Sequence, residues 1–296
     1  MGRKKRFAAA SPSPVPNFVP ATMDRPGLFG TDAFSPREIA TRVEEVGVAK
    51  ARLPLGSLFV LGVLAGAFIG LGAMFFTLVM ADASLGFAAS RVLGGLVFSL
   101  GLLLVVVAGA ELFTGNNLLV MAWTDGAITT RELLRNWAVV LVANAVGAIG
   151  LALLVHASGH PAMNGGAVAE AYVRIATAKC AMPFPQAFFS GMLCNALVCL
   201  AVWMTFAGRS VVDKAVAIVF PITAFVAAGF EHSVANLYLL PMGLLCAGPG
   251  EGPALSGMAA DLLAVILGNV VGGGGLVALI YHLVYRRQGG VGKGAR

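Results

Sequence analysis

An acid and an imidazole stand side by side in the middle of a long apolar stretch, and this pair constrains the chain more than any other feature. Glu231 and His232 lie at the centre of the segment Gly229-Phe-Glu-His-Ser-Val-Ala-Asn236, with hydrophobic sequence on both sides. Moving such side chains into hydrocarbon costs on the order of several kcal/mol unless each finds a partner or water. We therefore expect both residues to have a function at membrane depth.

The composition places the whole chain in a membrane. Of its 296 residues 58% are hydrophobic and 11% charged, and apolar stretches of transmembrane length recur. The net charge of +6 could suggest nucleic acid. However, all the Lys and Arg residues except Arg91, Arg174 and Lys179 fall on one side of the predicted spans. This positive-inside pattern predicts a multi-pass protein of a bacterial-type inner membrane, with both termini cytoplasmic and no nucleic-acid partner.

A weak internal repeat organises the chain. Segment 109–116, Gly-Ala-Glu-Leu-Phe-Thr-Gly-Asn, aligns with segment 229–236, and the run that begins at Asn144 resembles the run that begins at Asn269. The matches occur in the same order, so the chain is read as two copies of one unit. Six predicted crossings then form two groups of three, which forces the second copy to run upside-down. We expect an all-α membrane protein of two inverted three-helix repeats.

The predicted domain limits follow from the same pattern. Residues 1–34 form a disordered extension, 35–52 a cytoplasmic amphipathic helix, 53–287 the six-helix channel domain and 288–296 a cytoplasmic tail. The amphipathic helix opens with a capping box, Ser35-Pro-Arg-Glu38. The expected spans are 55–80, 91–123, 132–156, 184–206, 215–246 and 260–285. Residues 157–183 are expected to form a long external loop, and a loop containing Glu251 and Asp261 to precede the last span.

The second and fifth spans are predicted to break, at 111–117 and 229–236. A broken helix exposes unpaired N–H groups where its second half begins, near Asn117 and Val234 here, and two such ends favour an anion. A cation site would need more inward carboxylates than Glu111 and Glu231. These two are expected to accept hydrogen bonds from N–H groups of the broken backbone. The four cysteines form no CxxC motif, and no metal or cofactor is expected.

Three motifs resemble the formate/nitrite transporter family, and formate channels most closely. They are Gly109-Ala-Glu-Leu-Phe-Thr114, Cys194-Asn-Ala-Leu-Val-Cys-Leu-Ala-Val-Trp203 and the segment 229–236. The resemblance covers about residues 35–287. It implies an aquaporin-like fold and a homopentamer with a separate pore in each protomer.

The resemblance also implies roles for particular residues. His232 is similar to the family's central histidine, Thr114 to the threonine that faces it, Lys179 to the external lysine and Asn269 to an asparagine of the central chamber. Phe98 and Phe225 match an external apolar constriction. The cytoplasmic constriction is matched by Leu102, Val198, Leu112 and Phe113.

A mechanism follows from the energetics of a dry pore. Forcing a bare anion through an apolar ring costs many kcal/mol, which the neutral acid avoids. We expect Lys179 to attract a small monovalent anion, with formate the best single choice. His232 would act as proton donor, relay or charge-setting partner, and Thr114 would hydrogen-bond the substrate. Glu231 would brace the broken backbone.

Other functions remain open at this stage. Nitrite or hydrosulfide could use the same pathway, because each is a small protonatable anion. A neutral-solute channel of the aquaporin type is a different class, although no Asn-Pro-Ala occurs at either break. An intramembrane enzyme could use Glu231, His232 and the adjacent Ser233. No Gly-x-Ser-x-Gly motif or metal set accompanies them, so an enzyme is not expected.

Overall fold

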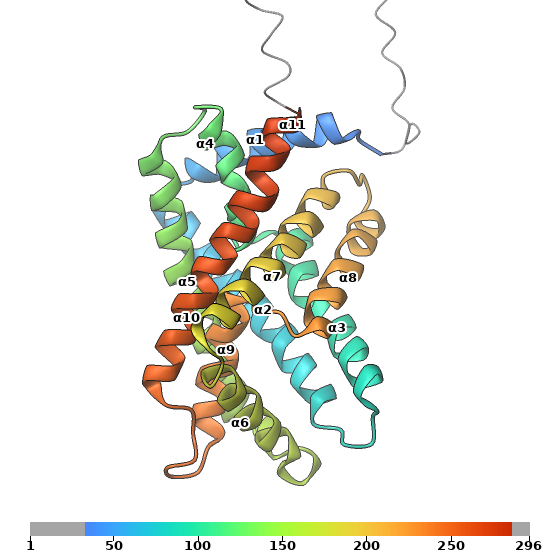
Figure 1. Ribbon diagram of the computed structural model, residues 1–296, viewed down its shortest axis with the longest axis vertical. Coiled ribbons are helices and arrows are strands. Elements are labelled where there is room, and N and C mark those ends of the chain that lie inside the picture. Colours follow the sequence, from blue (N-terminus) through green and yellow to red (C-terminus); the bar gives the residue numbers. More distant parts are fainter. Residues whose placement is uncertain (1–32, 286–296) are drawn as a thin grey trace, which may run out of the picture.

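The chain folds into a bundle of membrane-length helices. The structure is a computed structural model that describes residues 33–285, and within that range it contains helices and no strands (Figure 1). Six segments are long and apolar enough to cross a membrane, as predicted. They are Leu55–Met80 (α2), Phe87–Gly109 (α3 and the π-helix η1), Thr130–Ala157 (α5), Phe184–Thr205 (α7), Val211–Ala228 (α8) and Leu255–Tyr285 (α10, the π-helix η5 and α11).

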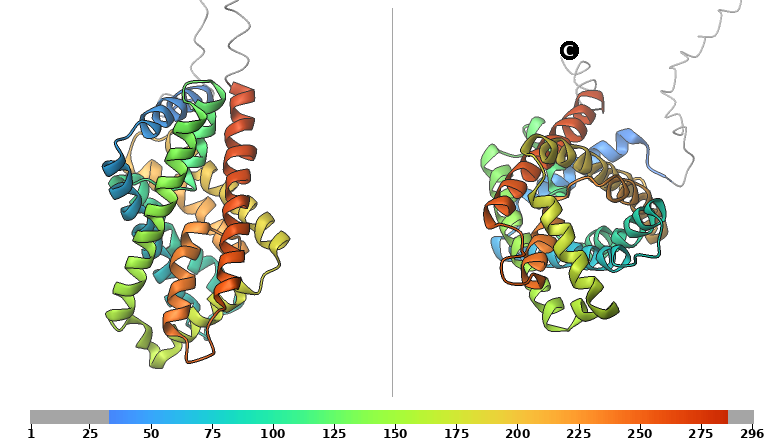
Figure 2. Two further views of the ribbon diagram at one scale, coloured as in Figure 1. Left: turned by 90° about the vertical axis from the view of Figure 1, so that its left-hand side faces the viewer. Right: turned by 60° about the horizontal axis from the view of Figure 1, so that its bottom comes forward.

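The two halves have the same internal packing. In the first half α2 packs against α3 and α5, and in the second α7 packs against α8 and α10. Each half also contains a half-length helix after its broken span. These are η2 with α4, Gly115–Leu119 and Val120–Thr124, in the first half, and α9, Ser233–Cys246, in the second. The spans stand around a common axis (Figure 2).

Both predicted breaks are present, and each follows a glycine in a left-handed conformation. The π-helix η1, Val105–Gly109, ends at Gly109 with φ 86°, and α8, Val211–Ala228, is followed by Gly229 with φ 78°. Residues with a side chain rarely adopt such angles. The breaks are shorter than expected, because the next helical segments begin at Gly115 and Ser233.

Two glycines of the repeat allow close approach of helices. A Cβ atom on Gly147 of α5 would collide with the carbonyl group of Val63 on α2. A Cβ atom on Gly272 of η5 would collide in the same way with the carbonyl group of Met192 on α7. Small residues at such crossings let the backbones touch. The repeat therefore specifies helix contacts as well as helix order.

Helix α1, Pro36–Ala51, lies across one end of the bundle, as Figure 1 shows. Ser35 and Glu38 form the capping box, and their hydrogen bonds hold the pKa of Glu38 below its usual value. Ile39 and Val43 are buried on the face towards the bundle. The predicted extension 1–34, apart from residues 33 and 34, and the predicted tail 288–296 lie outside the described residues.

The expectation of a loop at 157–183 was wrong. After two short turns, residues 167–180 form helix α6, Ala167–Cys180, at the end of the bundle opposite α1 (Figure 1). Val168, Ala171 and Tyr172 are buried on one face of α6, which packs against α9. Gly and Pro before the helix hid this amphipathic pattern. Helices α1 and α6 each precede one repeat and each carry a lysine in the last turn, Lys50 and Lys179.

Candidate functional site

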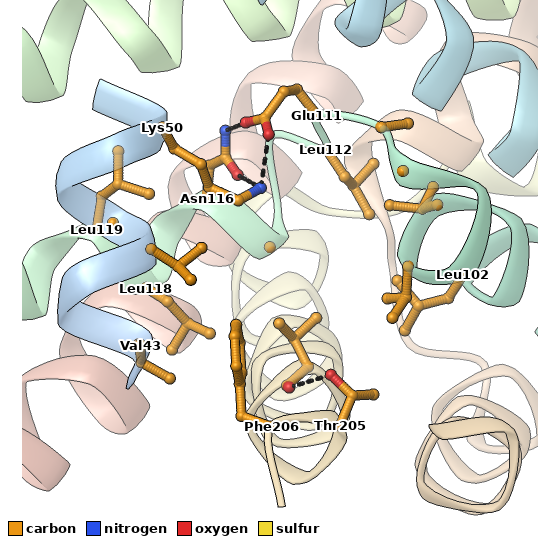
Figure 3. Close-up of a pocket in the computed structure, with 18 of the residues that line it drawn as sticks. Val43, Lys50, Leu102, Glu111, Leu112, Asn116, Leu118, Leu119, Thr205 and Phe206 are labelled. Atoms are coloured by element: carbon orange, nitrogen blue, oxygen red, sulfur yellow. Dashed lines mark hydrogen bonds and ion pairs between the residues drawn. The ribbon is translucent and has the colours of Figure 1, made fainter. Parts of the chain in front are cut away.

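Two cavities enter the bundle from opposite ends. One of about 420 Å³ lies under α1 and is lined by Lys50, Leu102, Glu111 and Leu112 among others (Figure 3). The other, of about 270 Å³, lies under α6. Its lining includes Lys179, Arg91, Phe98, Phe225 and His232. Buried side chains of both broken spans separate the two cavities.

His232 and Thr114 meet at the centre of this barrier. The Nε2 atom of His232 lies 3.0 Å from Oγ1 of Thr114, and both side chains are buried. The Nδ1 atom of His232 caps α9 by accepting the N–H of Ala235 at 3.1 Å. This places the proton of the neutral ring on Nε2, from which it can be donated to Thr114. A doubly protonated ring would lose the cap.

Apolar rings surround the pair on the α6 side. Phe98 and Phe225 meet edge to face with centroids 5.8 Å apart, and Phe225 stacks on His232 at 5.9 Å. All three line the same cavity. The predicted external constriction thus consists of side chains that the structure brings together.

The predicted cytoplasmic constriction is only partly assembled. Leu102, one turn along α3 from Phe98, and Leu112 both line the cavity under α1. Val198 and Phe113 are buried but line neither cavity. The ring of Phe113 instead packs on Trp137, with centroids 6.4 Å apart.

A polar network lies beside His232 in the second half. Nζ of Lys179 lies 2.6 Å from Oε2 of Glu231. The side-chain amide of Asn236 donates to Oε2 of Glu231 and to Oδ2 of Asp261, both at 2.8 Å. Arg91 also lines this cavity, and it donates to the last carbonyl groups of α8 at 2.9 and 3.0 Å.

The first half contains a matching network, which the sequence analysis missed. Nζ of Lys50 lies 2.8 Å from Oε1 of Glu111 and 3.2 Å from Oδ1 of Asn116 (Figure 3). The amide of Asn116 donates to Oε2 of Glu111 at 2.8 Å and to Oδ1 of Asn136 at 2.9 Å. Lys50 precedes Gly62 by the spacing that separates Lys179 from Gly191. That spacing was the signal that could have identified it.

Two asparagines hold the broken backbone in place. The amide of Asn144 donates to the carbonyl groups of Gly62 and Glu111 and accepts the N–H of Phe113. Asn269 repeats this arrangement with Gly191, Glu231 and Ser233. Asn269, expected to face the chamber, therefore uses its amide to fix the position of the break.

Two sequence-based expectations need correction here. The carboxylates of Glu111 and Glu231 accept from lysine and asparagine side chains, whereas the loop N–H groups bind Asn144 and Asn269. A carboxylate beside a lysine gains more from that cation than from a neutral amide. Asp261 was expected in a loop. It lies inside α10, Leu255–Val270, and is 3% exposed.

The described residues offer cations for an anion and no cluster for a metal. Lys50, Lys179 and Arg91 line the cavities. No group of three or more His, Cys, Asp or Glu residues that could hold a metal ion occurs between residues 33 and 285. The site is therefore suited to admit an anion at either end and to strip it of water in the middle.

Comparisons with known proteins agree with this geometry. Residues 37–283 match the formate/nitrite transporter family. The formate channel FocA of Escherichia coli K12 is 38% identical over 274 residues, which cover 87% of this chain and 96% of FocA. A solved pentameric formate channel with formate bound is 37% identical with a TM-score of 0.73, covering 78% of this chain and 97% of that one.

A more distant match concerns the fold alone. The aquaglyceroporin of Plasmodium falciparum is 14% identical with a TM-score of 0.50, covering 80% of this chain and 99% of that one. The fold is therefore aquaporin-like. The sequence relatives are channels and transporters, not enzymes, which rules out the intramembrane enzyme. With its repeated motifs, its two broken spans and these matches, the chain is an anion channel that belongs to the formate/nitrite transporter family.

Proposed function

We propose that this protein is a formate channel that assembles as a homopentamer with a separate pore in each protomer. Similarity to formate channels supports formate as the substrate, and a pentameric relative supports the assembly. The distribution of Lys and Arg supports an inner-membrane location with both termini in the cytoplasm. The cavity under α1 is then cytoplasmic and the cavity under α6 external.

Entry is electrostatic in this proposal. Lys179 at the external end and Lys50 at the cytoplasmic end each line a cavity and each contact a carboxylate. A cation in a recess of low dielectric raises the local concentration of anions. Arg91 adds a second positive charge to the external cavity. Formate therefore accumulates at the two mouths.

Passage requires loss of charge. Between the mouths lie the buried apolar side chains of Phe98, Phe225 and Leu102, where a bare anion would pay a desolvation penalty of many kcal/mol. As formate loses water its proton affinity rises, so it takes a proton from the water of one cavity, crosses as the neutral acid and returns the proton to the water of the other cavity. The observation that carries the proposal is the contact between His232 and Thr114 inside this apolar barrier.

The geometry favours a hydrogen-bonding role for His232 over the roles of proton donor, relay or charge-setting partner. Its Nδ1 is occupied as the cap of α9, so its Nε2–H group faces Thr114 and can instead be donated to the substrate. Thr114 supplies an acceptor and a donor at the same point. His232 then acts as the hydrogen-bonding partner of the passing acid, and taking a second proton would break the cap. Asn269, Val198 and Phe113 support the barrier without facing the substrate.

The test is formate flux through reconstituted protein, measured across pH for the wild type and His232→Asn. The substitution removes the imidazole N–H group that would meet the passing acid, so we expect the flux of formate to fall at every pH. His156→Asn, the same change at an exposed position on α5, is the matched control. Flux equal to wild type at every pH in His232→Asn would remove His232 from the mechanism.

The same vesicles distinguish the alternatives. Nitrite and hydrosulfide are tested beside formate, because they would use the same barrier. Osmotic swelling in glycerol without any anion flux would instead indicate the neutral-solute channel. Native mass spectrometry of the detergent-extracted protein checks the pentamer, and any smaller stable assembly would contradict it.

A further inference from the structure

The two polar networks differ at one position. Asn136 of the first half and Asp261 of the second half precede Asn144 and Asn269 by the same spacing, so they correspond in the repeat. Each accepts a hydrogen bond from the asparagine that also binds the glutamate. An amide in one half is thus a carboxyl group in the other.

The amide is satisfied and the carboxyl group is not. Asn136 accepts from Asn116 at 2.9 Å and donates to the carbonyl group of Lys50 at 3.2 Å. Asp261 receives one bond, from Asn236, and its other oxygen Oδ1 is buried without a partner among the described residues. The Oδ1 atom of Asn236 is also buried without a partner. The second network therefore lacks a donor.

The charges of the two networks also indicate that the second network lacks a proton. The first network contains one lysine and one carboxylate, Lys50 and Glu111. The second contains Lys179, Glu231 and Asp261, whereas Arg91 beside it donates to carbonyl groups of α8. The hydrogen-bonded network would therefore have an uncompensated negative charge if both carboxyl groups were ionised. A buried charge without its own partner is costly, and a carboxyl group avoids the cost by holding a proton. That proton also supplies the missing donor.

We propose that Asp261 is a proton-binding site that controls anion entry at the external mouth. With the proton bound, the second network carries the same net charge as the first. With the proton lost, a negative charge lies directly behind Asn236, which lines the external cavity. The cytoplasmic mouth has Asn136 at this place and no such control.

Several titratable groups surround this site, from α6, α7 and α9, which pack on α10, and from α3. Glu231 shares the donor Asn236 with Asp261, and Cys180 of α6 interacts electrostatically with Asp261. The others act through Glu231 or Lys179; they are Arg91 on α3, Cys194 on α7 and His232 at the start of α9. Lys179 is bound to Glu231 at 2.6 Å.

The expected effect on entry can be estimated. A unit charge about 10 Å away, at an effective dielectric constant of about 20, changes the local concentration of a monovalent anion by roughly tenfold. A rise in pH should therefore suppress entry of formate at the external mouth. This suppression adds to the fall in the protonated fraction of formate itself. This consequence for flux rests on the proposed function.

The decisive experiment exchanges the two residues. Formate flux is measured with equal pH on both sides of the vesicle for wild type, Asp261→Asn and Asn136→Asp. We expect the ratio of Asp261→Asn to wild type to rise roughly tenfold from acidic to alkaline pH, and the ratio for Asn136→Asp to fall. The exchange uses side chains that the other half already holds. Ratios that stay constant with pH would overturn the control of entry.

A second measurement does not depend on flux. Infrared difference spectra of the purified wild-type protein should show a protonated carboxyl band that disappears as pH rises and is absent from Asp261→Asn. A wild-type spectrum without that band at any pH would overturn the proton site even if formate flux is intact. The band without flux of any anion would leave the proton site standing and reject the proposed function instead.

Discussion

The two halves of the molecule hold their broken spans by the same contacts and differ in a residue within the break itself. Asn144 and Asn269 make equivalent bonds, and Lys50–Glu111 repeats Lys179–Glu231. At the break, however, Leu112 of the first half corresponds in position to His232 of the second. Residues that are the same in both copies build the scaffold. The residues that act on the substrate are expected at positions where the two copies differ.

The largest expected effect concerns the two asparagines. Asn144→Ala and Asn269→Ala each leave one N–H and one carbonyl group of the break without their amide partner and remove a further bond to a helix carbonyl group, a loss of roughly 4 kcal/mol in stability. If the halves are equivalent, both variants should lower the thermal midpoint by similar amounts. Ser57→Ala, at an exposed position, is the control. A large loss in only one variant would show that the scaffold is not shared equally.

Helix contacts test the same equivalence. Gly147→Ala and Gly272→Ala would each drive a methyl group into a facing carbonyl group, with an expected loss of about 3 kcal/mol or more. Gly150→Ala, on the same helix as Gly147, meets nothing within 4 Å and should stabilise by about 0.5 kcal/mol. Thermal unfolding in detergent measures all three. A stable Gly147→Ala protein would contradict the close crossing of α2 and α5.

Replacing the lysine at each mouth tests whether the two mouths are equivalent. Lys50→Met and Lys179→Met each remove one cation from one cavity, and each should lower the initial rate of formate flux by roughly tenfold at low salt. Arg174→Met is the control, because Arg174 lines neither cavity and is exposed. A loss that is confined to one lysine would mean that the mouths are not equivalent.

The smallest expected effect concerns the N-terminal cap, which α1 has and α6 lacks. Ser35 and Glu38 cap α1, whereas α6 begins at Gly166 without a side-chain cap. Ser35→Ala should therefore speed hydrogen exchange in the first turn of α1 a few-fold and leave α6 unchanged. The pKa of Glu38 in the folded protein is lowered. The cap should therefore be fully formed at any pH above the ordinary pKa of glutamate, and it should weaken only as the pH falls through the lowered pKa of Glu38. Exchange that is equally fast in both proteins would contradict the cap.

Much of the fold could be predicted because membrane spans are long and uniformly apolar. The span Leu55–Met80 has the predicted limits, and both breaks fall where Glu111 and Glu231 interrupt hydrophobic sequence. Helix α6 was missed because it is short and follows Gly and Pro. Its amphipathic pattern has meaning only once α9 is known to pack against it.

The site was predicted less completely, since its partners come from distant parts of the chain. The contact of His232 with Thr114 was expected from the resemblance, and the structure places the two side chains 3.0 Å apart. Lys50 lies on a surface helix in the sequence, and nothing local indicates that it reaches Glu111. Asp261 follows Gly, Pro and Glu, so local composition suggested a loop instead of the interior of α10.

The bonds of Asn144 and Asn269 also limit how the pore can move. Each amide ties a break to two neighbouring helices by three hydrogen bonds. Displacing either break means losing three buried bonds at once, which makes such excursions rare. Opening of the central barrier should therefore proceed by rotation of side chains such as Phe98 and Leu102, on the time scale of rotamer exchange, with the backbone at rest.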